Sequence, residues 1–188
     1  MKTIGILGGM SWASTALYYE RLNRQAQARL GGLHSAEILL RSVDFADIEA
    51  MQAAGDWDAA GARLNRAARE LEAGGAELLV LATNTMHKVA DAMLDGVTLP
   101  FLHIAEATAA AIHEAGLSRP GLMATAYTME QDFYTGGLRR AGLEPLVPGA
   151  ADRAETHRII YEELCRGIVT DESRAVYEGI ARRLADRG

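Results

Sequence analysis

The sequence contains a single cysteine, Cys165, among its 188 residues. A lone cysteine cannot form an internal disulfide, so the disulfide-rich class of secreted domains is excluded and a reducing cytoplasm fits best. No apolar run approaches the roughly 20 residues that a membrane span needs. The first seven residues have one charge and a strand-length apolar run, but not the longer apolar region and cleavage site of a signal peptide. These absences predict a cytoplasmic protein without a membrane partner.

Basic residues are also few, since 19 Lys and Arg against 25 Asp and Glu give a formal net charge of −6. Nucleic-acid binding needs a basic face, so we predict no nucleic-acid partner. The five histidines are scattered without the spacing of metal ligands, which predicts no metal. At 49% hydrophobic and 23% charged residues, the composition is that of an ordinary globular protein with one large or two small domains.

One stretch, Leu78 to Lys88, organises the rest of the chain. An apolar run at 78–82 has the length of a buried strand, and Thr83, Asn84 and Thr85 follow it just before a helical pattern that begins at His87. In open α/β sheets, ligands bind at the carboxyl ends of strands, where a helix start also offers free N–H groups. The alternative is that Asn84 or Thr85 only caps the helix.

The start of the chain has a similar layout. A predicted strand at 2–7 is followed by the turn Gly8-Gly9-Met10-Ser11, in which glycines let a ligand approach the backbone. Ser11 is placed to cap the next helix. The spacing of Gly5, Gly8 and Gly9 is not that of a dinucleotide fingerprint, so a loop for a small carboxylate or phosphate is favoured.

Strand and helix patterns alternate to the end of the chain, which predicts parallel sheets covered by helices. The predicted strands are 2–7, 37–43, 77–82, 101–104, 120–125 and 143–147, and the main helices are 12–30, 48–53, 56–74, 87–94, 105–115, 128–142, 152–166 and 172–186. Periodicity lapses at 95–100, where a glycine and a proline lie close together. We therefore predict an N-terminal α/β domain at 1–97 and a second α/β domain at 98–188.

Two further positions belong to the predicted site. Gln52 lies in the short helix after the second strand, near the same type of sheet edge, although a solvated helix residue is the alternative. Thr125 ends the strand at 120–125, and Thr128 is predicted to cap a helix with a weak point at Gly136-Gly137. Right-handed crossovers place the turns after all these strands at the carboxyl edge of their sheets.

Several stretches, taken in order, resemble the aspartate/glutamate racemase family over essentially the whole chain. They are IGILGGMSW (4–12), GGLHSA (31–36), SVDF (42–45), TNTMHK (83–88), LPFLHI (99–104), YTMEQDFY (127–134) and IYEELC (160–165). The resemblance implies two similar parallel-sheet α/β domains with the active site in the cleft between them. It also implies racemisation of aspartate- or glutamate-type amino acids by two-base α-proton transfer, without pyridoxal phosphate, nucleotide, metal or other cofactor.

On this resemblance Thr83 takes the first proton-transfer position, which is usually the cysteine of a C-N-T motif. An aliphatic hydroxyl is far harder to ionise than a thiol, so Thr83 would need a local donor or base, for which His87 is the nearest titratable group. The alternative for His87 is a packed or solvated helix residue. The predicted substrate-binding residues are Gly9, Met10, Ser11, Gln52, Asn84, Thr85 and Thr125, with Asn84 and Thr85 stabilising the enediolate charge.

The second departure from the family is that no G-C-T motif follows a late strand. Cys165 is predicted to lie in the middle of a helix as a small buried apolar residue, and Arg166 is either a solvated arginine or a partner for a dicarboxylate. The expectation is that the chain is an incomplete version of a longer one, with the second domain lacking a strand.

Three functions are consistent with these residues: an amino-acid racemase, a related carbon-acid decarboxylase or cis-trans isomerase, and a non-catalytic amino-acid-binding protein. The first is favoured, with a small amino acid as its partner. A homodimer, the preferred substrate and the activity of these 188 residues stay open.

Overall fold

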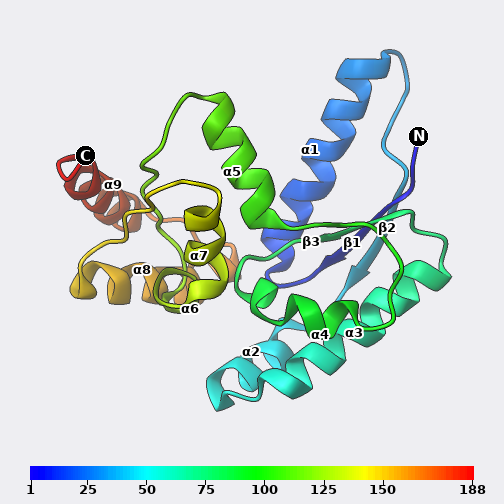
Figure 1. Cartoon of the computed structure of the whole chain (residues 1–188), viewed down its shortest axis with the longest axis horizontal. Helices are drawn as coiled ribbons and strands as arrows, with labels where there is room; N and C mark the ends of the chain where they lie inside the picture. Colours follow the sequence, from blue (N-terminus) through cyan, green and yellow to red (C-terminus); the bar gives the residue numbers. More distant parts are fainter. The chain divides into compact units, whose positions relative to one another are not determined.

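The computed structural model describes all residues from 1 to 188 (Figure 1). Internal contacts divide the chain after His103 into unit 1, Met1–His103, and unit 2, Ile104–Gly188. Each unit has a hydrophobic cluster of its own. The domain boundary predicted from sequence, after Val97, stays a prediction.

Unit 1 is built on one parallel sheet of four strands in the order β2-β1-β3-β4. The strands are β1 (Ile4–Gly8), β2 (Ile38–Ser42), β3 (Leu78–Leu81) and β4 (Phe101–Leu102). Each lies within a strand predicted from the sequence or one residue beyond it, although β4 keeps only two residues. Parallel pairing needs a crossover between successive strands, which is why helical segments alternate with them.

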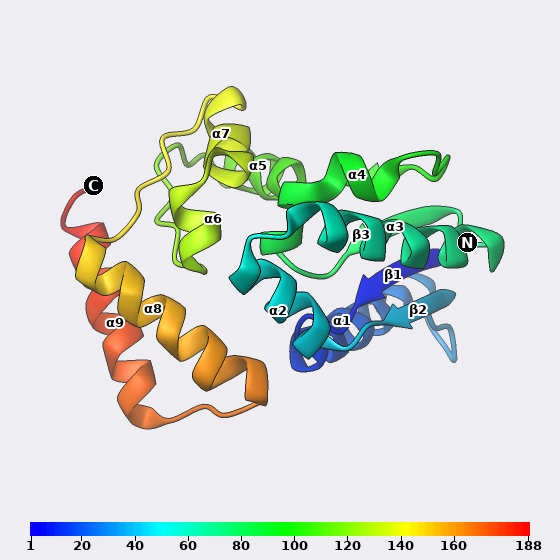
Figure 2. The same cartoon turned by 90° about the horizontal axis from the view of Figure 1, so that it is seen from below.

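The helices of unit 1 cover the sheet unevenly. Helix α1 (Trp12–Leu30) runs along one face, whereas α3 (Trp57–Ala73) and α4 (Ala90–Leu94) lie on the other (Figures 1 and 2). The remaining elements of unit 1 are α2 (Phe45–Ala54) and the 3₁₀ helix η1 (Thr85–Val89). The α-helix predicted to begin at His87 is therefore a 3₁₀ turn that passes into α4 at Ala90.

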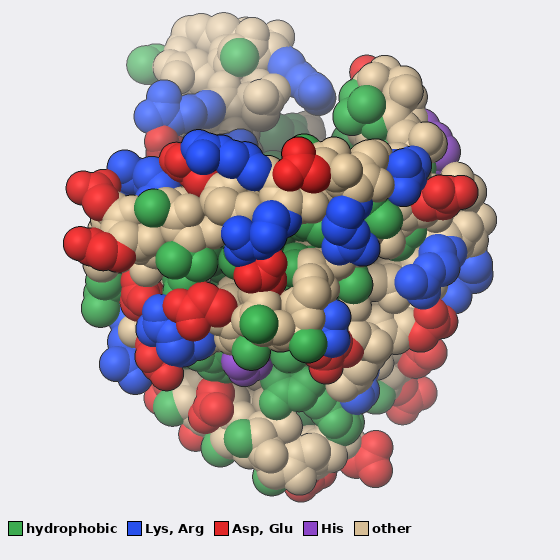
Figure 3. All heavy atoms as spheres, turned by 90° about the vertical axis from the view of Figure 1, so that its left-hand side faces the viewer, with side chains coloured by type: hydrophobic (Ala, Val, Ile, Leu, Met, Phe, Trp, Pro, Cys, Tyr) green, Lys and Arg blue, Asp and Glu red, His purple; other side chains and the backbone are tan.

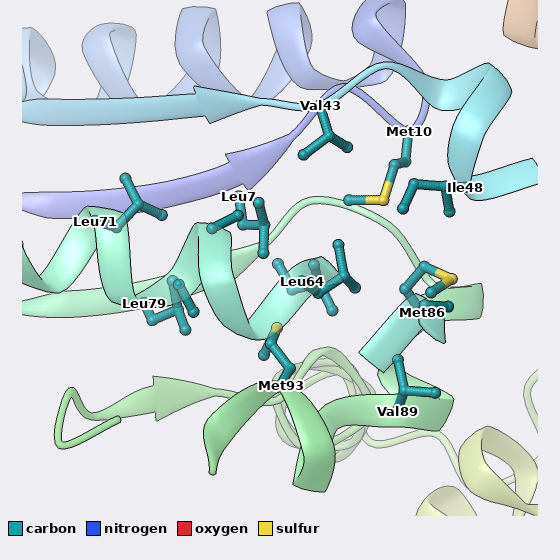
Figure 4. Close-up of a cluster of buried hydrophobic side chains, with 14 of the residues drawn as sticks. Leu7, Met10, Val43, Ile48, Leu64, Leu71, Leu79, Met86, Val89 and Met93 are labelled. Carbon is teal, nitrogen blue, oxygen red and sulfur yellow. The ribbon is translucent and has the colours of Figure 1, made fainter. Parts of the chain in front are cut away.

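The main core lies between the sheet and α3. Asp56 caps this helix by accepting the N–H of Ala59 at 3.0 Å. Its buried face carries Ala60, Gly61, Leu64, Ala67, Ala68 and Leu71. Figure 4 shows Leu64 and Leu71 facing Leu7 and Leu79 of the sheet. Each fully buried leucine contributes about 2 kcal/mol of burial free energy, so this layer fixes the strands that carry the site.

Unit 2 consists mainly of helices. They are α5 (Ile104–Glu114), α6 (Ala126–Glu130), α7 (Asp132–Arg140), α8 (Ala150–Glu162), the 3₁₀ helix η2 (Leu164–Arg166) and α9 (Asp171–Ala185). A small cluster that includes Tyr134, Leu138 and Leu143 forms its core.

The prediction of a second parallel sheet is wrong. The segments 120–125 and 143–147 meet only at one isolated parallel bridge, Gly121 with Leu146. Pro120, Pro145 and Pro148 lie in or beside these segments, and proline has no N–H to donate to a ladder. The structure therefore has one parallel sheet, the four-stranded one in unit 1.

The helix predicted at 128–142 differs in two ways. Its cap is Thr125, which accepts the N–H of Thr128 at 3.3 Å, so the cap lies three residues before the predicted one, Thr128. It is then broken at Gln131, whose backbone is extended (φ −101°, ψ 152°), and not at Gly136-Gly137, which lie inside α7. Thr128 itself is fully buried.

Helices α8 and α9 are joined by charged side chains. Arg183 of α9 donates to both carboxylate oxygens of Asp152 on α8, at 2.8 and 2.7 Å. The face drawn in Figure 3 has acidic and basic side chains interspersed. Exposed pairs of this kind each contribute about 0–1 kcal/mol, so they orient the helices more than they stabilise them. No helix in the structure is long and apolar enough to cross a membrane.

Candidate functional site

The candidate site starts at the carboxyl edge of the sheet, where β1 and β3 lie side by side. The chain leaves β1 towards β2 on one side and leaves β3 towards β4 on the other, so β1 and β3 form the topological switch point. Leu7 pairs with Leu81, and the N–H of Ala82 donates to the carbonyl of Leu7 at 2.9 Å. The turns at 8–11 and 83–85 therefore start next to each other, as the sequence predicts. Ligands of open α/β sheets bind at such a point.

The turn after β1 depends on two glycines. A Cβ at Gly8 would lie 2.4 Å from Cγ2 of Thr15, and one at Gly9 would lie 2.2 Å from the carbonyl oxygen of Val43. Gly9 also has φ at +96°, which L side chains rarely adopt. Its N–H donates to Oγ1 of Thr15 at 2.9 Å, and that hydroxyl donates to the carbonyl of Ser11 at 2.9 Å. Thr15 therefore fastens the turn to the first turn of α1.

Ser11 and Met10 are both buried, with structural contacts of their own. Ser11 caps α1, since its hydroxyl accepts the N–H of Ser14 at 3.3 Å, which confirms the predicted cap. The side chain of Met10 belongs to the main core, where it lies beside Ile48 (Figure 4). Because its side chain is in the core, Met10 would contact a ligand only through its backbone.

The three polar residues after β3 differ in exposure. Thr83 is half-buried, Asn84 is exposed and Thr85 is buried. Asn84 takes the N-cap position of η1 but makes no side-chain hydrogen bond to the helix, so its side chain does not serve as a cap. Of the three, Asn84 presents its amide to solvent, where it can meet a ligand.

His87 is held in place by the backbone of this same stretch. Its Nδ1 lies 2.7 Å from the carbonyl oxygen of Thr83, and its ring packs edge-on against His103, with 4.6 Å between centroids. Burial, and then the neighbouring His103, lower the pKa of His87 to about 4, against the opposing effect of hydrogen bonds to the backbone of Thr83 and Asn84. The ring is therefore neutral at neutral pH, and a carbonyl only accepts, so Nδ1 carries the proton. His87 is thus a packed residue, as in the alternative weighed for it, and its Nδ1 binds the carbonyl of Thr83.

Gln52 lies on α2 and is 3% exposed. Its Nε2 donates to Sδ of Met86 at 2.9 Å, which ties α2 to η1. The alternative that Gln52 is a solvated helix residue is wrong, because its side chain is buried and bonded to Met86. Its role in binding stays a prediction.

The last predicted binding residue, Thr125, belongs to unit 2, where it is half-buried and caps α6. Its hydroxyl also lies 3.1 Å from the hydroxyl of Thr128. The N–H of the next residue, Ala126, donates to Nδ1 of His157 at 3.1 Å.

Cys165 and Arg166 lie in η2, where Cys165 is half-buried and Arg166 is exposed. The prediction of a buried cysteine in the middle of a helix is wrong, because α8 ends at Glu162. The structure has no group of three or more His, Cys, Asp or Glu side chains that could hold a metal ion. A cavity of about 290 Å³ in unit 2 is lined by none of the predicted residues; its walls include Arg119, Met123, Leu146 and Leu184.

Sequence reasoning missed Thr15 and His157. Thr15 follows Ser11 by four residues on one helix, so it could have been found as a hydroxyl facing the glycine turn. His157 is separated from Ala126 by 31 residues, and no local pattern links the two.

Unit 1 is an α/β unit with hydroxyl and amide groups at the switch point of a parallel sheet, the edge at which open α/β sheets generally bind small ligands. A family model described as Asp/Glu/Hydantoin racemase matches residues 7–188. The chain belongs to this family.

Solved structures support the assignment. The chain is similar to a candidate Asp/Glu racemase from Yersinia pestis, with 50% sequence identity and a TM-score of 0.89 over 100% of this chain and 82% of that chain. It is also similar to an aspartate racemase homologue from Pyrococcus horikoshii OT3, with 32% identity and a TM-score of 0.82 over 100% and 82% of the two chains. The aspartate racemase of Picrophilus torridus is similar in fold, with 20% identity and a TM-score of 0.78 over 99% and 77%.

Proposed function

We propose that this protein exchanges the α-proton of an aspartate- or glutamate-type amino acid as part of a cofactor-independent racemisation. The observation that carries the proposal is the placement of the glycine turn at 8–11 and the polar stretch at 83–85 at neighbouring positions of one sheet edge. Family membership supplies the class of reaction.

The chemistry needs a site for the substrate carboxylate, because removing the α-proton moves negative charge onto it. Backbone N–H groups and neutral amide or hydroxyl donors stabilise such charge when they are held in place beforehand. Gly9, Met10 and Ser11 would bind through the turn, and Asn84 and Thr85 through their side chains. Gln52, which is anchored to Met86, would complete this set.

Thr83 is proposed as the acid/base on one face of the α-carbon. It occupies the position of the family's first cysteine, and its carbonyl is held by His87 at 2.7 Å. An aliphatic hydroxyl gives up its proton much less readily than a thiol, so exchange at this face is expected to be slow. The cysteine of a G-C-T motif has no counterpart among these 188 residues, and the proposal assigns only the Thr83 face.

The proposal extends to unit 2. Thr125 is given a substrate-binding role, which rests on the pattern of hydroxyls after an apolar segment.

The weak acid/base at position 83 favours one competing function, a protein that binds an amino acid without reacting with it. A carbon-acid decarboxylase is the other competitor. Incubating the protein with each enantiomer of aspartate and glutamate in D₂O separates the three. Deuterium at the α-carbon supports the proposal, release of carbon dioxide indicates a decarboxylase, and binding heat alone indicates a binding protein.

The variant Asn84→Ala tests the site itself. Asn84 is exposed and makes no cap bond, so its loss should leave the melting temperature unchanged. It should weaken amino-acid binding by about tenfold, the effect of one lost hydrogen bond to a charged group. Asn65→Ala is the matched control, because Asn65 donates to the carbonyls of Met93 and Asp95 and should affect stability without changing the intrinsic affinity. Unchanged affinity in Asn84→Ala would show that the amino acid does not bind at this edge of the sheet.

A further inference from the structure

The contact between α8 and the start of α6 is made by a histidine that no part of the proposed reaction uses. His157 lies on α8, half-buried, and its Nδ1 accepts the backbone N–H of Ala126 at 3.1 Å. Its ring is flanked by Tyr127, at 5.9 Å between centroids, and Tyr161, at 4.6 Å. Because Nδ1 accepts, the neutral ring must carry its proton on Nε2.

The helix that receives this contact is weak on its own. Helix α6 spans only Ala126–Glu130, whereas isolated helices shorter than about 12 residues are marginal in water. The first N–H groups of any helix also lack partners within it. In α6, Thr125 accepts the N–H of Thr128, and His157 accepts that of Ala126. One of the two acceptors is thus the proposed binding residue, and the other is the histidine.

We propose that His157 is a positioning residue that holds the backbone next to Thr125, and so fixes the Thr125 hydroxyl for substrate binding. This inference rests on the proposed function, in which Thr125 binds the amino acid. His157 would act through the Ala126 amide and would not touch the substrate.

The bond requires an unprotonated Nδ1, so protonation of His157 would break it. Burial lowers the pKa of His157, and the carboxylate of Glu130 opposes that shift. Glu130 is itself paired with Arg153 at 2.8 Å. The other titratable groups beside the ring are Tyr127 of α6 and Tyr161 of α8. Substrate binding should therefore weaken as pH falls through the pKa of His157.

Two amide variants separate positioning from general damage. In His157→Asn, Oδ1 takes the place of Nδ1 and can accept the Ala126 N–H at every pH. In His157→Gln, the amide lies one carbon further out and cannot. Two measurements are made on wild type and both variants: hydrogen exchange of the Ala126 amide by NMR, and the dissociation constants of aspartate and glutamate between about pH 5 and pH 8.

In His157→Gln, we expect the Ala126 amide to exchange about tenfold faster and the dissociation constant of the amino acid to rise about tenfold. Both changes correspond to the loss of one hydrogen bond. The dissociation constant of His157→Asn should be close to that of wild type at pH 8. As pH falls, this variant should not show the part of the loss of affinity that comes from protonation of His157. Equal Ala126 protection in His157→Gln and wild type would overturn the inference, and so would an unchanged pH profile in His157→Asn.

Failure of the proposed function gives a different result. If wild type binds neither amino acid, or if Thr125→Val binds as well as wild type, Thr125 has no role in binding and the substrate half of the inference falls with it. Ala126 exchange still decides whether His157 holds the turn.

Discussion

Nδ1 of His87 lies 2.7 Å from the carbonyl oxygen of Thr83, four residues earlier in the chain. The bond links η1 to the segment that follows β3, and it fixes the backbone of Thr83, the residue proposed as acid/base. Sequence alone offers His87 as a base for the Thr83 hydroxyl, whereas the structure shows it bound to the Thr83 backbone. The neutral state of His87 is therefore part of what stabilises this edge of the sheet.

Stability should fall in acid because of His87. Its pKa is about 4 in the folded chain against an ordinary 6.5, so between these values the unfolded chain binds more protons. The contribution is fully present above about pH 6.5 and is lost as pH falls, for a total of about 3 kcal/mol. Urea unfolding of wild type and His87→Asn at several pH values measures it. His34→Gln, in an exposed loop, is the control, and an equal acid loss in His87→Asn and wild type would show that His87 is not responsible.

The glycine turn can be tested with a matched pair of alanine variants. Gly9 and Gly75 have similar φ angles, +96° and +94°, but a Cβ at Gly9 meets the Val43 carbonyl whereas one at Gly75 meets nothing within 4 Å. We expect Gly75→Ala to cost about 1 kcal/mol of unfolding free energy, from backbone conformation alone. Gly9→Ala should cost about 3 kcal/mol, because the overlap adds to it. Equal costs would mean that the turn moves freely, and it would then be a poor binding element.

We expect Thr15 to stabilise the fold through its hydroxyl. Thr15→Val removes both the acceptor of the Gly9 N–H and the donor to the Ser11 carbonyl in a buried position, so about 2 kcal/mol of unfolding free energy should be lost. Thr15→Ser keeps the hydroxyl and should recover part of that loss in the same thermal or urea measurement. A serine variant that is less stable than the valine variant would indicate that packing of the Thr15 methyl dominates.

A variant of the buried residue Gln52 can distinguish a packing role from a binding role. Methionine matches glutamine in length and cannot donate a hydrogen bond, so Gln52→Met should change stability by about 1 kcal/mol or less. Its affinity for aspartate or glutamate, measured by calorimetry, should fall about tenfold if Gln52 binds the ligand. Gln27→Met, on an exposed part of α1, is the matched control. Unchanged affinity in Gln52→Met would leave Gln52 with a packing role only.

Local patterns were enough to locate most of unit 1. The cap at Ser11 and the helices predicted at 12–30 and 56–74 depend on residues close together in sequence, and the structure confirms them. The edge that joins Gly9 to Asn84 was also predictable, because parallel strands joined by right-handed crossovers end on one side.

Features that depend on distant partners were not predictable. The segment 120–125 reads as a strand, but a strand needs a ladder, and only Gly121 and Leu146 form a bridge. The break of the helix at Gln131 has no signal in the sequence. Burial of Gln52 against Met86 and the contact of His157 with Ala126 both arise when separate elements pack together.

The central claim, that Thr83 handles the α-proton, is tested most directly by NMR of deuterium uptake at the α-carbon of each enantiomer of aspartate and glutamate in D₂O. We predict slow exchange, with retention of configuration, of the enantiomer whose α-proton faces Thr83. Thr83→Cys should speed that exchange, because a thiol ionises more readily, and Thr83→Ala should abolish it. The claim is contradicted if Thr83→Ala exchanges that enantiomer as fast as wild type, or if none of the three proteins, Thr83→Cys included, exceeds the uncatalysed rate.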